Sequence, residues 1–239
     1  MSNDELAEIV ETSDEWIFSH TGIRYRHIAD DDSAASDLGV EAARIALERA
    51  ELSAEDLDLV LVATSTPDYP GLPSTAPVIQ VRIGAPRAGA MDLVAACTGF
   101  IYGLETARAY VNSGAARNVL VIGAEVYSKI INWKDRNTCV LFGDGAGAVV
   151  VTTDELGGAS KVVDSVLRSR GSGADALLRP VGGSRNPVSS CGSTEDIYLQ
   201  MQGRKVYTFA VQVVVDTINE LLERNRLTID DIDHVVPHQ

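Results

Sequence analysis

The sequence Met91-Asp-Leu-Val-Ala-Ala-Cys-Thr-Gly-Phe-Ile-Tyr-Gly-Leu104 runs from an apolar strand straight into a helix of small residues, with Cys97 at the joint. A thiol in this position meets the unpaired N–H groups and the positive end of the helix dipole, and both favour the thiolate. Cys97 is therefore a candidate nucleophile. Taken alone, the spacing is more typical of a lone cysteine that packs as a small hydrophobic residue.

Strand and helix patterns alternate on both sides of this stretch. Residues 57–63 and 118–124 are apolar runs typical of buried strands, whereas 33–50, 99–113 and 203–226 carry apolar residues at helical spacing. Gly99, Gly103 and Ala107 leave one face of the helix over 99–113 nearly without side chains, which favours close packing at the centre of a domain. The order of elements predicts an α/β fold.

A second candidate lies in Asp233-His-Val-Val-Pro-His-Gln239, where an apolar strand is expected to deliver His238. A cysteine and a histidine that are far apart in sequence, each at the end of a strand, can meet at one edge of a sheet. Cys/His nucleophilic sites are commonly assembled in this way. Cys97 and His238 are the predicted catalytic pair.

These features and several further segments resemble the β-ketoacyl-acyl-carrier-protein synthase III family, which belongs to the thiolase superfamily of condensing enzymes. The matching segments occur in the family's order over nearly the whole chain, at residues 12–17, 21–24, 92–104, 135–136, 142–148 and 236–239. The resemblance implies a thiolase-like, layered α-β-α-β-α fold built from two similar halves. We expect an N-terminal half with the nucleophile over residues 1–158 and a partial C-terminal half over 159–239, the second half being incomplete.

The resemblance also implies substrate-binding residues. Trp16 and Arg136 would flank the adenine of coenzyme A, and Arg24 would lie on its phosphate or adenine side. The remaining residues would line the acyl pocket or the pantetheine channel: Leu72, Phe142, Gly203 and Tyr207. Each position also has a structural interpretation, because a tryptophan at a helix end is often a core or interface anchor, an exposed arginine often forms a salt bridge, and Tyr207 fits a packed core equally well.

Composition excludes several classes of protein. The chain has 45% hydrophobic and 23% charged residues, no apolar run long enough to span a bilayer and no secretory signal, so we expect a cytoplasmic protein. A formal net charge of −14 argues against nucleic acid or an anionic membrane as partners. Three cysteines in no metal-ligand spacing argue against a zinc site. The run from Phe142 to Ala148 leads into a strand rather than a helix, so it is not a phosphate-binding loop.

The reaction implied by the resemblance is a decarboxylating Claisen condensation of a short acyl-CoA primer with malonyl-acyl carrier protein, which initiates type II fatty-acid synthesis. It requires no metal or redox cofactor, and the enzyme would act as a homodimer. An acidic carrier protein would need a local basic patch on this acidic chain. Three alternatives remain open: an acyltransferase of the same fold that moves the acyl group to an alcohol or amine, a degradative thiolase, and a non-catalytic partner.

Two departures from the family pattern concern the ends of the chain. The sequence begins without the family's opening strand and ends at Gln239, before an expected Ala-Asn and the segment with a third catalytic residue, an asparagine. No catalytic asparagine is assigned here. We expect a truncated chain that is poorly soluble and inactive in condensation.

Overall fold

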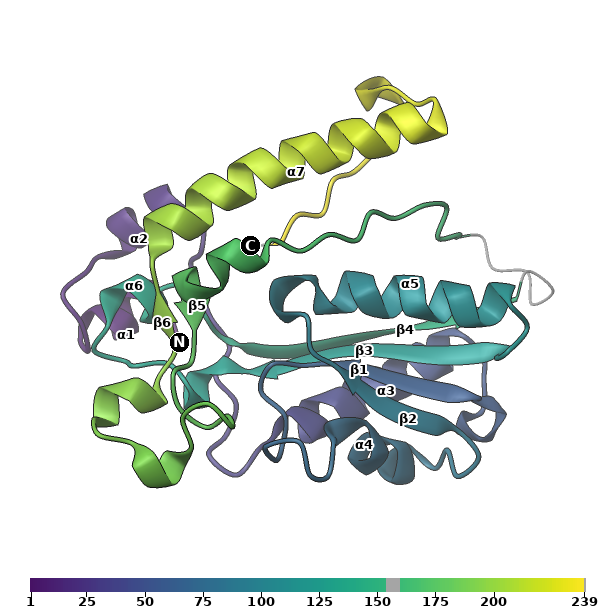
Figure 1. The fold of residues 1–239 in the computed structure, drawn as a ribbon, viewed down its shortest axis with the longest axis horizontal. Coiled ribbons are helices and arrows are strands. Elements are labelled where there is room, and N and C mark those ends of the chain that lie inside the picture. Colours follow the sequence, from purple (N-terminus) through teal and green to yellow (C-terminus); the bar gives the residue numbers. More distant parts are fainter. Residues whose placement is uncertain (154–159, 239) are drawn as a thin grey trace. The chain divides into compact units, whose positions relative to one another are not determined.

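The computed structural model describes residues 1–153 and 160–238, and their contacts group them into two units (Figure 1). His27–Ser128 and Gly143–Val163 form what we call the sheet unit. Met1–Arg26, Lys129–Phe142 and Asp164–Gln239 form the α7 unit. These boundaries run differently along the chain from the predicted division at residue 158, which stays a prediction.

The sheet unit is built on four strands in the order β2-β1-β3-β4. β1 (Leu59–Ala63) lies between β2 (Gly89–Leu93) and β3 (Asn118–Val126) and is parallel to both, while β4 (Asp144–Thr152) pairs antiparallel with β3. All five residues of β1 are buried, because a central parallel strand is covered on both faces. This explains why its sequence is a continuous apolar run.

Helices cover both faces of this sheet. α3 (Ala35–Arg49) and α4 (Thr75–Ile83) lie on one face and α5 (Gly99–Asn112) on the other (Figure 1). Side chains alternate between the faces along each strand. Those packed in the core with α3 and α4 include Val60, Val62, Leu120 and Ile122, and those packed with α5 include Leu59, Leu61, Val119 and Val121. The sheet unit is thus a three-layer α/β/α sandwich, as the alternation of elements predicts.

α5 approaches the sheet closely because its inner face lacks side chains. A Cβ added at Gly99 would lie 3.1 Å from the Cβ of Ala63, and one added at Gly103 would lie 2.7 Å from Cγ1 of Val121. Gly99, Gly103 and Ala107 are the buried residues of this helix. The predicted close packing of this helix is confirmed.

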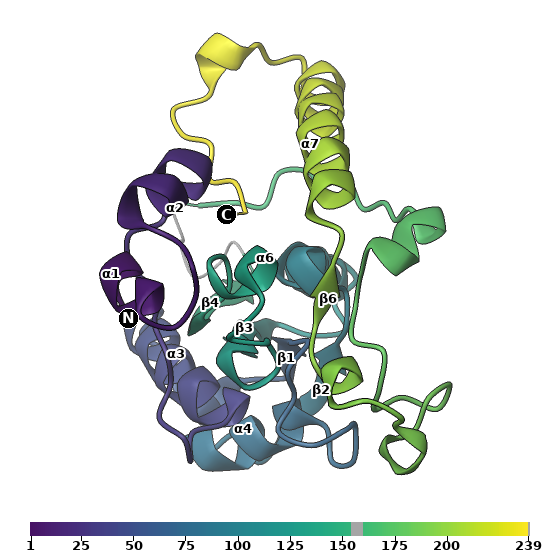
Figure 2. The same cartoon turned by 90° about the vertical axis from the view of Figure 1, so that its left-hand side faces the viewer.

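The α7 unit contains the helices α1 (Asn3–Ala7), α2 (Asp14–Thr21), α6 (Arg136–Cys139) and α7 (Gly203–Asn225), and a two-stranded sheet of β5 (Leu177–Leu178) and β6 (Gln200–Met201) (Figures 1 and 2). A buried arginine joins its segments: the guanidinium of Arg26 donates to Oδ1 of Asn3 at 2.6 Å and to the carbonyl oxygen of Val140 at 3.3 Å. Ser13 begins α2 by accepting a hydrogen bond from the N–H of Trp16 at 3.1 Å.

Several sequence predictions for this unit are wrong. The apolar residues over 162–167 and 233–238 predict two strands, but neither segment forms one. A strand requires a neighbour for its backbone hydrogen bonds, and none of the described residues pairs with either segment. The predicted N-cap at Thr12-Ser-Asp-Glu does open a second short helix, α2. α7 has the predicted length, but none of its residues is buried within the described chain, so the expected buried face is not observed.

Candidate active site

Cys97 lies between the end of β2 and the start of α5. Residues Ala96–Thr98 form a single 3-10 turn, and Ala96 has φ 46°, a left-handed conformation that non-glycine residues adopt at a cost of about 1–2 kcal/mol. Both the N–H and the hydroxyl of Thr98 donate to the carbonyl oxygen of Ala95, at 3.2 and 2.9 Å. This tight turn places Cys97 at the strand-helix junction, as predicted, and leaves the residue exposed.

The carboxyl ends of β1, β2 and β3 meet at the same edge of the sheet because the three strands are parallel. Glu125, near the end of β3, reaches the residues that follow β1: its carboxylate accepts from the N–H of Ser65 at 2.8 Å and from the hydroxyl of Thr66 at 2.5 Å. The same Thr66 oxygen accepts from the N–H of Val126 at 2.8 Å. A partly buried carboxylate therefore lies at the sheet edge that also carries Cys97.

Electrostatics at this edge oppose ionisation of the cysteine. Desolvation raises the pKa of Cys97, and the negative charge of Glu125 raises it further. Although the residue is exposed, enough protein surrounds its sulfur for desolvation to be the largest cause of the raised pKa. The expectation that the helix terminus lowers this pKa is therefore wrong for this structure, because desolvation and a nearby carboxylate outweigh the favourable backbone.

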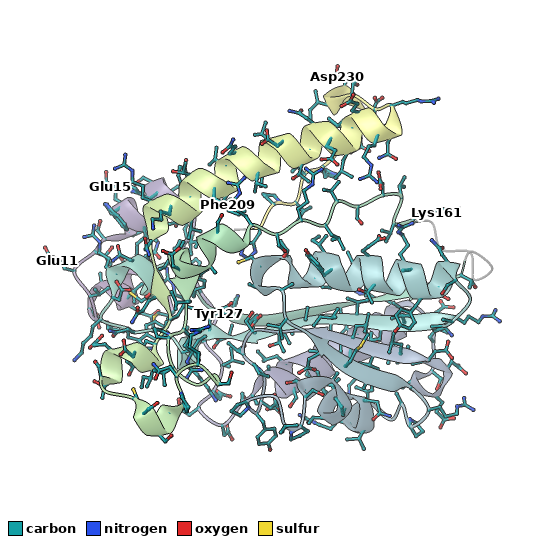
Figure 3. All side chains as sticks on the ribbon, in the orientation of Figure 1. Glu11, Glu15, Tyr127, Lys161, Phe209 and Asp230 are labelled. Carbon is teal, nitrogen blue, oxygen red and sulfur yellow. The ribbon has the colours of Figure 1, made fainter. Side chains whose placement is uncertain are left out.

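Two further groups at this edge have shifted pKa values. Desolvation raises the pKa of Glu125, while hydrogen bonds from Thr66 and Ser65 act in the opposite direction. Desolvation, together with the charge of Glu125, raises the pKa of Tyr127 to about 12. Tyr127 (labelled in Figure 3) is neutral at physiological pH, so Glu125 is the negative charge that acts on Cys97.

A second cluster surrounds Trp16 in the α7 unit. The guanidinium carbon of Arg136 lies 4.2 Å from the centroid of the Trp16 ring, and the imidazole of His20 stacks on that ring with centroids 4.4 Å apart. The structure thus brings Trp16 and Arg136 together as predicted. A purine inserted between two flat groups holds them about 7 Å apart, because each face of the purine makes a van der Waals contact of about 3.5 Å. In this structure Arg136 is in direct contact with Trp16, so adenine would have to displace the guanidinium.

Arg24 belongs to the same helical region. Its guanidinium lies 3.7 Å from the centroid of Phe18 and 3.1 Å from a carboxylate oxygen of Asp14. The structural interpretation of a surface ion pair therefore describes Arg24 in this structure. Its role toward a phosphate stays a prediction, and a phosphate would compete with Asp14.

The other predicted site residues are not brought into one cluster by the described contacts. His238 is exposed and lies in the α7 unit, whereas Cys97 lies in the sheet unit. Leu72 is 90% exposed, and Tyr207 is 71% exposed on the first turns of α7. Gly203 begins α7, and Phe142 is half-buried. The roles of all five residues stay predictions.

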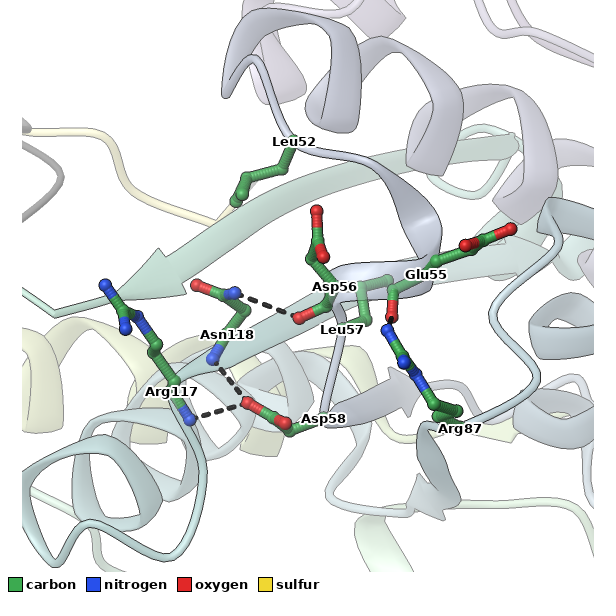
Figure 4. Close-up of a pocket in the computed structure, with 8 residues that line it drawn as sticks. All are labelled: Leu52, Glu55, Asp56, Leu57, Asp58, Arg87, Arg117 and Asn118. Carbon is green, nitrogen blue, oxygen red and sulfur yellow. Dashed lines mark hydrogen bonds between the residues drawn. The ribbon is translucent and has the colours of Figure 1, made fainter.

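A pocket of about 450 Å³ in the sheet unit lies at the opposite edge, where the strands begin (Figure 4). Its polar groups hold the chain in place. The carboxylate of Asp58 accepts from the N–H groups of Arg117 and Asn118 at 2.7 and 2.9 Å, and Arg87 donates to the carbonyl oxygen of Glu55 at 2.6 Å. Ligands of open α/β sheets bind at the carboxyl ends of strands, so this pocket is not the candidate active site.

The α7 unit has a basic pocket of about 420 Å³, lined by Arg170, Arg204, Lys205, Thr208, Phe209 and Gln212. Phe209, labelled on α7 in Figure 3, lies 5.0 Å from the guanidinium carbon of Arg170. Lys205 is 3.6 Å from a carboxylate oxygen of Asp175, and no acidic residue lines the pocket itself. The arrangement suits an anionic group.

Over residues 1–153 and 160–238, no group of three or more His, Cys, Asp or Glu side chains is arranged to hold a metal ion. Within the same ranges, none of the helices combines the length and apolar character needed to cross a membrane.

Known proteins of one family match this chain. Residues 91–171 match the family model described as 3-oxoacyl-[acyl-carrier-protein (ACP)] synthase III. The β-ketoacyl-[acyl-carrier-protein] synthase III of Caldanaerobacter subterraneus is 51% identical over 240 residues, covering 100% of this chain and 72% of the relative. This chain belongs to the β-ketoacyl-[acyl-carrier-protein] synthase III family.

Solved structures of β-ketoacyl-[acyl-carrier-protein] synthase III and related enzymes have the same fold. The crystal structure of the Aquifex aeolicus enzyme is similar with a TM-score of 0.88 and 40% identity, covering 100% of this chain and 71% of that one. A priming β-ketosynthase from a polyketide biosynthetic pathway has a TM-score of 0.84 and 36% identity, covering 97% and 68%. The thiolase-like α/β fold predicted from the sequence is confirmed.

Sequence reasoning missed the groups around Cys97. The sequence could have indicated Glu125, because it is a charged residue in a largely apolar strand, Asn118-Val-Leu-Val-Ile-Gly-Ala-Glu-Val126. Nothing in the sequence distinguishes Thr66 in this way, because it lies in a loop rich in turn residues. His20 was also missed, because its stacking on Trp16 depends on their separation by one helical turn in α2.

Proposed function

We propose that this chain catalyses the condensation of a short acyl-CoA primer with malonyl-acyl carrier protein, giving a β-ketoacyl-acyl carrier protein that initiates type II fatty-acid synthesis. The observation that carries the proposal is the exposed Cys97 on a strained turn between β2 and α5. Membership of the β-ketoacyl-[acyl-carrier-protein] synthase III family, with 51% identity to one member, supports it.

The proposed reaction begins at the sulfur of Cys97. Its thiolate attacks the carbonyl carbon of the acyl thioester, the carbon–sulfur bond to coenzyme A breaks, and coenzyme A leaves as its thiol after taking up a proton. The acyl group is then held as a thioester of Cys97. Because the pKa of Cys97 is raised, a proton acceptor must act as the substrate binds, and we propose His238 for this role.

Condensation follows when malonyl carrier protein loses carbon dioxide. The electron pair of the broken carbon–carbon bond forms an enolate, whose oxygen requires hydrogen-bond donors, and we propose His238 as one of them. The carbanion attacks the acyl thioester and the bond to Cys97 breaks, which restores the thiol after protonation. The decarboxylation supplies the driving force, so the proposed reaction needs no resident metal or redox cofactor.

The basic pocket of the α7 unit supports an anionic partner. The chain as a whole carries a formal charge of −14, which repels an acidic carrier protein and the phosphates of coenzyme A. Arg170, Arg204 and Lys205 around one pocket offset this charge locally. We propose that this surface receives the acidic carrier protein or the phosphates of coenzyme A.

We propose a homodimer and a cytoplasmic location as well. β2 lies at the end of the strand order, and its outer edge pairs with no strand among the described residues, which leaves backbone groups available to a second copy. All three cysteines are free thiols, which suits a reducing compartment. Analytical ultracentrifugation tests the first point, and a monomer at micromolar concentration would contradict it.

The experiment that tests the function follows the acyl group. The protein is incubated with acetyl-CoA, and digestion with mass spectrometry should show one acetyl group on the peptide that contains Cys97. Addition of malonyl carrier protein should then release a β-ketoacyl product, and that product would show that the expectation of a chain inactive in condensation is wrong. Acetylated Cys97 that transfers its acetyl group to an alcohol or amine instead would support the acyltransferase alternative. Cys97→Ala, the matched control, should give neither signal, and an unacylated wild-type Cys97 would contradict the proposal.

A further inference from the structure

His20 is an exposed side chain to which the proposed reaction assigns no role. Its imidazole stacks on the indole of Trp16, with the ring centroids 4.4 Å apart and an angle of 21° between the ring planes. The two residues lie four positions apart in α2, which places their side chains on the same face of the helix. The indole therefore has an aromatic neighbour in the free protein.

A hydrogen bond sets the orientation of this imidazole. Nδ1 of His20 lies 2.8 Å from the carbonyl oxygen of Trp16, and because a carbonyl oxygen can only accept, Nδ1 carries the proton and donates it. The hydroxyl of Ser19 donates to the same carbonyl oxygen at 3.1 Å. His20 is thus tied to Trp16 twice, through the carbonyl oxygen of that residue and through the face of its indole.

The same indole contacts Arg136, which begins α6 in the same unit. Its guanidinium carbon lies 4.2 Å from the indole centroid, and one guanidinium nitrogen donates to the carbonyl oxygen of Glu11 at 3.2 Å. A purine that stacks on Trp16 in place of the guanidinium leaves the contact with His20 intact. Because His20 holds the indole before the purine arrives, the indole loses less freedom when the purine binds.

We propose that His20 is a positioning residue that holds the indole of Trp16 ready for the adenine of acyl-CoA. The inference rests on the proposed function, since it takes acyl-CoA as the substrate. Adenine is the flat aromatic group of that substrate, and bases stack on aromatic side chains through their π-faces. His20 acts through Trp16 and has no part in the reaction at the thioester, so it affects binding of acyl-CoA rather than the chemical step.

The test compares acetyl-CoA, which carries adenine, with acetyl-N-acetylcysteamine, which does not. In His20→Ala, KM for acetyl-CoA should rise about three- to tenfold, the range expected when one aromatic contact is lost and a side chain must be ordered on binding. The value of kcat and the reaction with acetyl-N-acetylcysteamine should not change. His20→Phe keeps a flat ring against the indole, so its KM should stay close to that of the wild type.

His27→Ala is the matched control. His27 is an exposed histidine of the sheet unit, and its backbone carbonyl rather than its ring accepts the hydrogen bond from the N–H of Asp144 at 2.8 Å. Its KM should match the wild type. An unchanged KM in His20→Ala, or an equal loss with both thioesters, would overturn the proposal. A His20→Phe variant as weak as His20→Ala would also overturn it, because the hydrogen bond rather than the stacked ring would then matter.

A second measurement needs no turnover. Isothermal titration calorimetry with coenzyme A should give a Kd for His20→Ala that is higher than the wild-type value by the same factor as KM, and equal Kd values would overturn the role of His20. His20→Gln keeps a good helix-forming residue in α2 without an aromatic ring, and it should lose as much affinity as His20→Ala. Wild-type protein that binds coenzyme A but reacts with neither thioester would contradict the proposed function, and the Kd values would then decide the role of His20 alone.

Discussion

The three cysteines differ in ways that their reactivity should reveal. Cys139 is fully buried, Cys191 is half-buried with its sulfur 2.9 Å from the carbonyl oxygen of Ser193, and Cys97 is exposed. We expect iodoacetamide to modify Cys97 first. Because its pKa is raised, the rate should keep rising with pH into the alkaline range rather than level off near neutrality. Peptide mass spectrometry measures the three rates, and equal rates would contradict the nucleophile assignment.

A second prediction for a single residue concerns Arg136. Its contact with Trp16 suggests that it binds the adenine end of acyl-CoA after moving off the indole. Arg136→Ala should raise KM for acyl-CoA about 5- to 30-fold, the equivalent of about 1–2 kcal/mol, and leave the reaction with acyl-N-acetylcysteamine unchanged. Arg44→Ala, which removes an exposed arginine paired with Glu41 on α3, is the control. Equal losses with both substrates would show that Arg136 is structural.

The packing of α5 on the sheet is a property of whole elements. At Gly103 an added methyl group would meet Cγ1 of Val121, a stiff, buried side chain of a central strand, at 2.7 Å. At Gly39 on α3 the nearest atom is Cδ1 of Ile79 at 2.6 Å, the movable end of a longer side chain. Both substitutions gain helix propensity, about 1 kcal/mol, but only Ile79 can move aside easily.

Gly103→Ala should therefore lower the free energy of unfolding by about 1–3 kcal/mol, and Gly39→Ala by less. Thermal melts followed by circular dichroism compare the two. A Gly103→Ala variant as stable as Gly39→Ala would mean that α5 can move away from the sheet at little cost, and the close contact would not be needed for stability.

Charge acts at the scale of the whole molecule. With a net charge of −14, the chain repels an acidic carrier protein except where Arg170, Arg204 and Lys205 gather. We expect Arg204→Ala to raise KM for malonyl carrier protein several-fold at low salt, and the difference from wild type to shrink as salt screens the charges. Arg49→Ala, at an exposed position at the end of α3, is the control. An effect of Arg204→Ala that salt does not change would argue against an electrostatic role.

The local sequence predicts those elements whose structure depends on the residues within them. The apolar run of β1 predicts a strand buried on both faces, and Gly99, Gly103 and Ala107 predict the bare face of α5. The joint between β2 and α5, where Cys97 lies, also follows from the order of residues. By contrast, strands predicted over 162–167 and 233–238 failed, because strand formation depends on a pairing neighbour that the local sequence does not contain.

The sequence by itself determined the α/β class, the family and the position of Cys97, because these depend on periodicity, on turn residues and on motifs that can be seen without knowing any long-range contact. Only the tertiary structure decided the surroundings of Cys97. The Ser65–Glu125 hydrogen bond joins residues at the ends of two different strands. Desolvation, together with the charge of Glu125, raises the pKa of the Cys97 thiol, so the helix terminus does not lower it. Desolvation and charge act through space, and the chain order does not encode distance.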